Sequence, residues 1–264
     1  MRAGVAIFAV AHNTFREAIR DKVLYGIVFF GVLGLAGTYV LSELASYESA
    51  RVVRDLALAG SNLLAILVAI VLGVTLLHKE VDRRTAYAIL PKPLHRWQFV
   101  IGKFCGMAAT LIALCVLLAG VVEALLRTQA STIDGPTAVA LVLSLLEVLV
   151  VTAVAVTLSC WTRPFLSGLL TAGIFILGRS AEEIGALAAR AEGPMRLVFD
   201  ALHKGLPNLY LFQVSGWEVA GKRVSIHGTF VDWAYVASAA TYAGLCIVGA
   251  LAIAVLLFRR RDFV

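Results

Sequence analysis

The stretch LALAGSNLLAILVAIVLGVTLL, residues 56–77, decides the class of fold. It contains no Asp, Glu, Lys or Arg in 22 residues, and about 20 apolar residues suffice for a helix to cross a bilayer. Residues 23–42, 104–122 and 233–258 have the same property. The whole chain of 264 residues is 60% hydrophobic and 15% charged, with a mean hydropathy of +0.89. This composition excludes a soluble globular domain.

Two further segments complete six predicted transmembrane helices. Residues 135–162 are interrupted only by Glu147, and residues 164–178 form a shorter apolar run that ends at Arg179. We therefore predict an all-α, polytopic integral membrane protein, with residues 1–264 forming a single transmembrane domain. Cys105, Cys115, Cys160 and Cys246 fall inside these spans, so they predict no disulfide framework.

The charges divide unequally between the two sides of the predicted membrane. Six crossings place both termini on one side together with residues 78–103 and Arg163, where 14 basic and five acidic residues give a net charge of +9. The other side has a net charge of −2. The positive-inside rule then predicts cytoplasmic termini. The basic composition therefore reflects topology, and we expect no nucleic-acid partner.

Residues 1–22 are predicted to form an amphipathic helix on the inner membrane surface. Phe8, Phe15 and Ile19 share one helical face, whereas Arg16, Arg20 and Lys22 lie off it. The tripeptide at residues 9–11 resembles a signal-peptidase site, but the apolar stretch before it is too short for a signal peptide.

The sequence contains only weak matches to nucleotide-binding, metal-binding or catalytic motifs. The sequence GWEVAGKR at residues 216–223 copies part of a P-loop, yet Arg223 replaces the Ser or Thr that binds magnesium. The five histidines are dispersed, and no nucleophile signature occurs. We predict neither a catalytic nor a metal site, and no cofactor in this chain. If ATP drives this protein, another chain binds it.

Glu147 is the one acidic residue deep in a predicted span, where an ionised side chain costs on the order of 3 kcal/mol. It should face protein or water rather than lipid. One interpretation is a substrate path or a proton-sensitive site. The other, which we favour, is a protonated side chain bonded to Ser144 or to a threonine of a neighbouring helix.

Residues 78–103, HKEVDRRTAYAILPKPLHRWQFVIGK, form a charged segment between two spans. A short helix over residues 79–90 is predicted, with Glu80 and Asp82 in its first turn and a stop at the prolines that follow. Such a helix suits docking onto a cytoplasmic partner; the alternative is a solvated basic loop. Across the membrane, residues 179–232 are predicted to contain an amphipathic helix broken at Gly193 and Pro194.

The charged segment of residues 78–103 resembles the segment after the second span in permease subunits of type-2 ABC exporters. The shared pattern is E-x-x-R-R-T…L-x-K-P-x-x-R-x-x-F-V-x-G-K, and the tail, with LPNLYLFQVS at residues 206–215 and FRRRDF at 258–263, is similar to the branch that includes the permease serving nitrous-oxide reductase copper maturation. Together with the entry motif at residues 11–21, the resemblance covers essentially the whole chain. The matching positions are Glu80, Arg83, Arg84, Thr85, Leu90, Lys92, Pro93, Arg96, Phe99, Val100, Gly102 and Lys103.

The resemblance implies a half-transporter of a bacterial inner membrane, paired with a second permease copy and with two cytoplasmic ATPase subunits that bind ATP and magnesium. It also implies that residues 78–103 form a coupling segment and that the helices within residues 179–232 cap the exit; a simple external cap is the alternative for the latter. An ATP-independent secondary transporter or channel, and a non-transporting anchor for cytoplasmic proteins, remain alternatives. The expected coupling and ATPase-docking residues are Glu80, Asp82, Arg83, Arg84, Thr85, Tyr87, Ile89, Lys92, Pro93 and Arg96.

Overall fold

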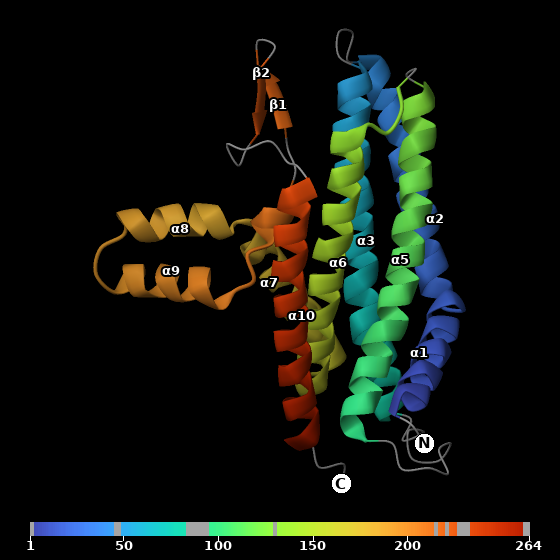
Figure 1. Ribbon diagram of the computed structural model, residues 1–264, viewed down its shortest axis with the longest axis vertical. Coiled ribbons are helices and arrows are strands. Elements are labelled where there is room, and N and C mark those ends of the chain that lie inside the picture. Colours follow the sequence, from blue (N-terminus) through green and yellow to red (C-terminus); the bar gives the residue numbers. More distant parts are fainter. Residues whose placement is uncertain are drawn as a thin grey trace.

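A computed structural model describes residues 3–44, 49–82, 95–128, 131–213, 216–219, 222–225 and 233–260. Its body is a bundle of long helices that run side by side (Figure 1). Five of them are long and apolar enough to cross a membrane, which confirms the all-α polytopic fold. These are α2 (Lys22–Leu44), α3 (Ser49–Asp82), α5 (Arg96–Thr128), α6 (Gly135–Trp161) and α10 (Trp233–Arg260).

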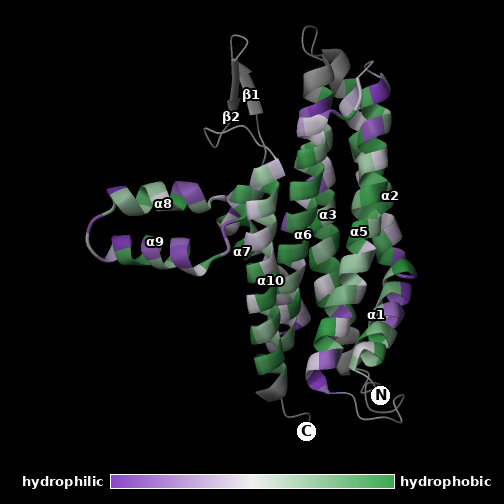
Figure 2. Ribbon diagram, viewed as in Figure 1, coloured by the Kyte–Doolittle hydropathy of each residue, from purple (hydrophilic) through white to green (hydrophobic). Residues whose placement is uncertain are grey.

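Helices α3 and α6 form the centre of the bundle. Buried residues make up 56% of the span in α3 and 61% in α6, against 11% in α2 and 17% in α10. The exposed side chains of the outer helices are largely apolar, as lipid-facing surfaces require, and include Phe30 and Leu245 (Figure 2). The start of α1 and the end of α10 lie at one end of the bundle, which we call the basal end (Figure 1).

Small residues allow α3 and α6 to approach closely. A Cβ atom on Gly73 would lie 2.5 Å from the Cβ of Ala155, and the Ser159 hydroxyl donates to the Gly73 carbonyl at 3.0 Å. Gly31, Gly102, Gly106 and Gly178 also lie close against neighbouring residues. Gly34, Gly37 and Gly173 face open space within the described residues.

The fifth predicted span is a short helix followed by a bend. Helix α7 (Pro164–Arg179) has 16 residues, or about 24 Å at 1.5 Å per residue, and is shorter than a hydrocarbon core of about 30 Å. Helix α8 (Ala181–Arg190) then departs at 66°. The described residues therefore contain five straight candidate spans, and the α7–α8 pair is bent as in a broken span or a re-entrant loop.

Beyond the bend, α8 and α9 (Pro194–Gly205) form an antiparallel pair that projects sideways from the bundle (Figure 1). The chain turns between them at Gly193, whose φ of 66° favours glycine, and this confirms the predicted break. The 3₁₀ turn η1 (Leu209–Phe212) leads back to the bundle. The amide of Asn208, just before it, donates to the Tyr242 hydroxyl of α10, and the Leu211 carbonyl within it accepts from the Tyr235 hydroxyl.

A small β-ribbon is the one departure from helix within the described residues. Strands β1 (Gly216–Val219) and β2 (Lys222–Ser225) pair antiparallel, with Gly216 opposite Ser225. They coincide with the P-loop-like sequence. Its lysine, Lys222, opens a β-strand, whereas a P-loop lysine stands at the start of a helix. The segment therefore does not have the architecture of a phosphate-binding loop.

The predicted N-terminal helix is α1 (Ala3–Ile19), which packs against the first half of α5. Its buried face consists of Ala6, Thr14 and Ala18, while Phe8 is 72% exposed and available to lipid. The contact depends on glycines of α5: a Cβ atom on Gly106 would lie 2.5 Å from the Ala11 carbonyl oxygen.

Gly106→Ala should therefore weaken the docking of α1 on α5, since the added methyl group meets backbone that cannot turn aside. We expect a loss of about 1–3 kcal/mol, seen as a lower melting temperature of the purified permease in detergent. Gly120→Ala on the same helix is the matched control, because nothing lies within 4 Å of its Cβ position. An equal or higher melting temperature for Gly106→Ala than for Gly120→Ala would contradict this packing.

Candidate functional site

Glu147 lies near the middle of α6 and is completely buried. It is 12 residues from the first residue of the helix and 14 from the last, or about 18 Å and 21 Å along the axis. No part of its surface reaches lipid. The expectation that this carboxylate faces protein is confirmed.

Two polar side chains from other helices meet Glu147. The side-chain amide of Asn62 on α3 donates to Glu147 Oε2 at 2.7 Å. Arg179, the last residue of α7, places its Nε 3.5 Å from Glu147 Oε1. We call Asn62, Glu147 and Arg179 the polar cluster; it joins the two central helices to the point where the chain bends from α7 into α8.

The hydrogen bonding of this cluster is incomplete within the described residues. Asn62 Oδ1, Glu147 Oε1 and Arg179 Nε are buried without a hydrogen-bond partner, and the contact between Glu147 and Arg179 is an ion pair only. The guanidinium also lies 5.4 Å from the ring centroid of Phe175. A buried pair that lacks part of its hydrogen bonds recovers only part of the desolvation cost. The polar cluster therefore has unused hydrogen-bond donors and acceptors that a rearrangement or a bound molecule could satisfy.

These partners differ from those expected from the sequence. Neither Ser144 nor a threonine bonds to Glu147 among the described residues, because Asn62 approaches from α3 and Arg179 from the end of α7. The sequence does contain features that point to Asn62 and Arg179 as partners. Asn62 is the one amide side chain in the apolar run of residues 56–77, and Arg179 ends the apolar run of α7.

The predicted coupling segment is only partly within the described residues. The backbone of α3 is helical through Asp82, so the prediction of a separate helix beginning at residue 79 is wrong: residues 79–82, including Glu80 and Asp82, are the last turn of α3. No Gly or Pro interrupts the chain between the span and this turn. The other predicted residues, except Arg96, lie outside the described residues: Arg83, Arg84, Thr85, Tyr87, Ile89, Lys92 and Pro93.

Arg96 opens α5 and ties it to the end of α10. Its Nη1 donates to the Phe258 carbonyl at 3.3 Å, and the rings of Phe99 and Phe258 stack with centroids 5.8 Å apart. A cation bonded to a carbonyl in the last turn of a helix also opposes the negative end of the helix dipole. The last turns of α10 and the first turn of α5 are thus fixed together at the basal end.

Lys103 is the second fully buried charge, and the sequence did not single it out beyond its place in the motif. Its Nζ donates to the Leu76 carbonyl of α3 at 3.3 Å and lies 3.5 Å from Glu17 Oε2 of α1. One ammonium group therefore joins α1, α3 and α5. It does so six residues before the end of α3, next to the start of the predicted coupling segment.

Two titratable groups outside the spans have shifted pKa values. Burial alone would raise the pKa of the Asp134 carboxyl. Hydrogen bonds from Thr137 and the charge of Arg54, 3.3 Å away, lower this pKa by more than burial raises it, so the net shift is downward. Burial, a hydrogen bond with Glu182 and the charge of Glu183 raise the pKa of the Tyr210 hydroxyl. Asp134 caps the start of α6 and Tyr210 lies in η1, so both groups stabilise connections between helices.

Residues 8–263 match the sequence profile of the ABC-2 family transporter proteins. The chain belongs to this family. It is a membrane permease of an ABC-type transporter, and family membership implies a partnership with an ABC ATPase. No curated protein matches the chain. In this ABC-2 permease the polar cluster lies within the membrane-spanning bundle, and Arg96 and Lys103, both near the start of α5, bond this helix to α10 and to α3.

Substitution of Glu147 should separate a structural from a titrating role. Glu147→Gln keeps the size and the bond to Asn62, so we expect normal insertion and assembly with little loss of transport. Glu147→Leu leaves Asn62 and Arg179 without a partner and should cost about 1–3 kcal/mol, measured as a lower melting temperature. Ser144→Ala, one turn away, is the control and should change neither quantity. Loss of transport in Glu147→Gln with an intact complex would instead indicate a titrating or substrate-contacting carboxylate.

Proposed function

We propose that this permease is the membrane half of an ATP-driven exporter in a bacterial inner membrane. Two permease copies would form the pathway, and two separate ATPase subunits on the cytoplasmic face would bind ATP and magnesium. The observation that carries the proposal is the ABC-2 profile match over residues 8–263 together with the charged connection between α3 and α5. We also propose that this chain belongs to the branch of the family that includes the permease serving nitrous-oxide reductase copper maturation, which its tail sequence resembles.

The basal end has the properties that a docking surface for an ATPase needs. The segments predicted to lie on that side have a net charge of +9, and α1, α3, α5 and α10 are bonded to one another there through Lys103 and Arg96. A force applied between α3 and α5 would therefore act on a connected set of helices rather than on a loose loop. This supports residues 78–103 as the coupling segment.

A homodimer is supported by the side of the bundle that bears α7, α8 and α9. The α8–α9 pair carries charged residues such as Glu182 and Arg196 and also exposes apolar side chains, with Leu197 73% exposed. Charged groups are costly in lipid, so this side suits a second permease copy and a water-filled pathway better than hydrocarbon. We propose that α8 and α9 cap the exit of that pathway and that Glu147 lies beside it.

An ion-coupled secondary transporter is the second candidate, because Glu147 and Arg179 form the kind of intramembrane charge pair that such carriers use. Affinity purification from native membranes distinguishes the two. A stoichiometric ATPase supports the exporter, whereas transport by the permease without an ATPase supports the secondary carrier.

Reversal of both Arg83 and Arg84 to Glu should weaken ATPase capture at least tenfold, or uncouple ATP hydrolysis from transport. Truncating one member of a charged pair that is excluded from water costs about 2–5 kcal/mol, and reversal adds repulsion. Co-purification and substrate-stimulated hydrolysis are the measurements. The control reverses Arg259 and Arg260, which changes the charge by the same amount near the C-terminus. Wild-type capture and coupling in the Arg83 and Arg84 variant would leave this segment only a topological role.

Cysteine labelling tests the proposed orientation. Single cysteines at Ser49, Ser215 and Arg84 in a Cys-free background are exposed to an impermeant maleimide on intact cells. We expect positions 49 and 215 to react and position 84 to stay unlabelled until the cells are opened. Labelling of position 84 from outside would reverse the orientation.

A further inference from the structure

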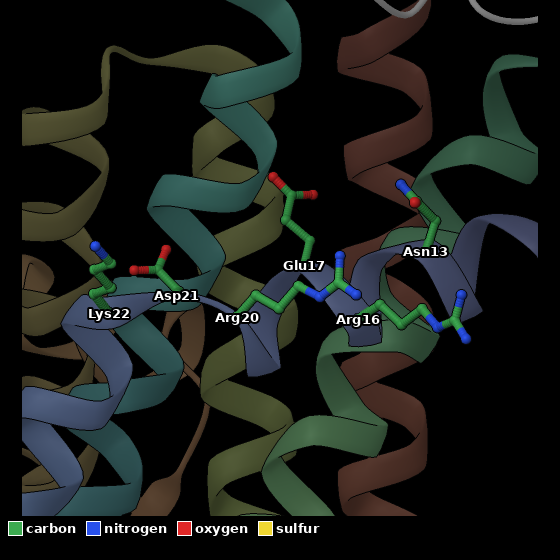
Figure 3. Close-up of a pocket in the computed structure, with 6 residues that line it drawn as sticks. All are labelled: Asn13, Arg16, Glu17, Arg20, Asp21 and Lys22. Carbon is green, nitrogen blue, oxygen red and sulfur yellow. The ribbon is translucent and has the colours of Figure 1, made fainter.

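The elbow between α1 and α2 contains an open, basic pocket. Its volume is about 630 Å³, and it is lined by Asn13, Arg16, Glu17, Arg20, Asp21 and Lys22. Figure 3 shows the guanidinium groups of Arg16 and Arg20 extending to the same side of α1, next to the amide of Asn13. Two guanidinium groups therefore lie on one side of α1, while Lys22 lies at the other end of the pocket, beyond Asp21 (Figure 3).

The two acidic residues of the pocket already have partners. Glu17 Oε2 pairs with the buried Lys103 at 3.5 Å, and Asp21 Oδ1 accepts a hydrogen bond from the Val23 amide at 3.0 Å. No ion pair involves Arg16, Arg20 or Lys22 anywhere in the part of the chain that the structure describes. The pocket consequently keeps an excess of positive charge that no carboxylate among the described residues neutralises.

The height of the pocket matches a lipid headgroup layer. Lys22 is the first residue of the candidate span Lys22–Val40, and Lys103, which holds Glu17, bonds to Leu76, the last residue of the span Val53–Leu76. The elbow thus lies where two spans end. Exposed apolar side chains flank it: Ile19 is 39% exposed, Val23 58% and Tyr25 57%.

We propose that this pocket binds the phosphate headgroup of an anionic phospholipid from the leaflet at the basal end. Arg16 and Arg20 donate to the phosphate oxygens and Lys22 adds a positive charge, while the acyl chains lie along Val23 and Tyr25 of α2. A guanidinium presents a pair of N–H donors that matches a phosphate, which favours arginine here. Bound lipid would hold α1 against the membrane and so fix the helix on which Glu17, the partner of Lys103, is located.

Lipid titration of the full-length purified permease tests the site. Native mass spectrometry would measure binding of dioleoyl phosphatidylglycerol to the wild type and to the triple variant Arg16→Gln, Arg20→Gln, Lys22→Gln. Near an anionic surface each Lys or Arg contributes about 1 kcal/mol, so we expect roughly fivefold weaker binding for each charge and on the order of 100-fold for all three. Dioleoyl phosphatidylcholine should bind both proteins equally weakly.

Two controls keep the result specific. Arg127→Gln, Arg190→Gln, Lys204→Gln removes the same charge from exposed places elsewhere and should retain phosphatidylglycerol binding. Arg16→Lys with Arg20→Lys keeps the charge and should lose only a fewfold, which separates lost recognition from misfolding. Unchanged phosphatidylglycerol binding by the triple variant would overturn the proposal. Glycerol phosphate that competes with phosphatidylglycerol at the same concentration would also overturn it, because the site would then bind a soluble phosphate. If the triple variant lost ATPase capture but kept lipid binding, the surface would instead be a protein-docking site.

Discussion

Removing a charge from water inside a helical bundle is costly, and two charged side chains in the described residues, Lys103 and Glu147, have no exposed surface. Each is paired across helices rather than along its own helix. Lys103 draws α1 and α3 to α5, and Glu147 draws α3 and α7 to α6. Lipid offers apolar helices little preference for one neighbour over another, so such bonds select which helices meet and at what height.

The two pairings differ in how completely they are satisfied. Lys103 donates to the Leu76 carbonyl, whose oxygen can accept this bond in addition to its bond within α3, and it also pairs with a carboxylate. Glu147 receives one good hydrogen bond, while its second oxygen has an ion-pair partner without hydrogen-bond geometry. The first pairing suits a fixed joint. The second pairing, next to the 66° bend between α7 and α8, suits a place where helices shift relative to one another.

Much of the fold could be predicted from the sequence because the bilayer imposes it. A long run without charges must be a helix in lipid, so residues 56–77 predict their own conformation without knowledge of their neighbours. The break at Gly193 and Pro194 is equally local, since glycine alone adopts that φ without strain. Whether residues 79–82 begin a new helix or end an old one is not settled by composition. Charged residues that suit a first turn are also good helix formers in a last turn.

The polar cluster could not be predicted in the same way. Asn62 and Glu147 are 85 residues apart, and their contact depends on the relative height of α3 and α6, which hydropathy does not determine. That height follows from close packing at positions such as Gly73 against Ala155 and from the hydroxyl of Ser159. Arg179 meets Glu147 because the 16 residues of α7, about 24 Å long, follow directly on α6 and match the distance of about 21 Å from Glu147 to the end of α6.

Helix α3 connects the two pairings. It contributes Asn62 to the polar cluster and the Leu76 carbonyl to Lys103, and these residues are 14 positions or about 21 Å apart on one helix. The same helix continues without a break to Asp82, where the charged connection to α5 begins. The central part of this 34-residue helix is buried and packs against both α5 and α6, so bending it there would break packing along both neighbours. Any displacement imposed at Asp82 therefore acts first on the joint at Lys103 and then on the less completely bonded carboxylate of Glu147, where the resistance to movement is lower.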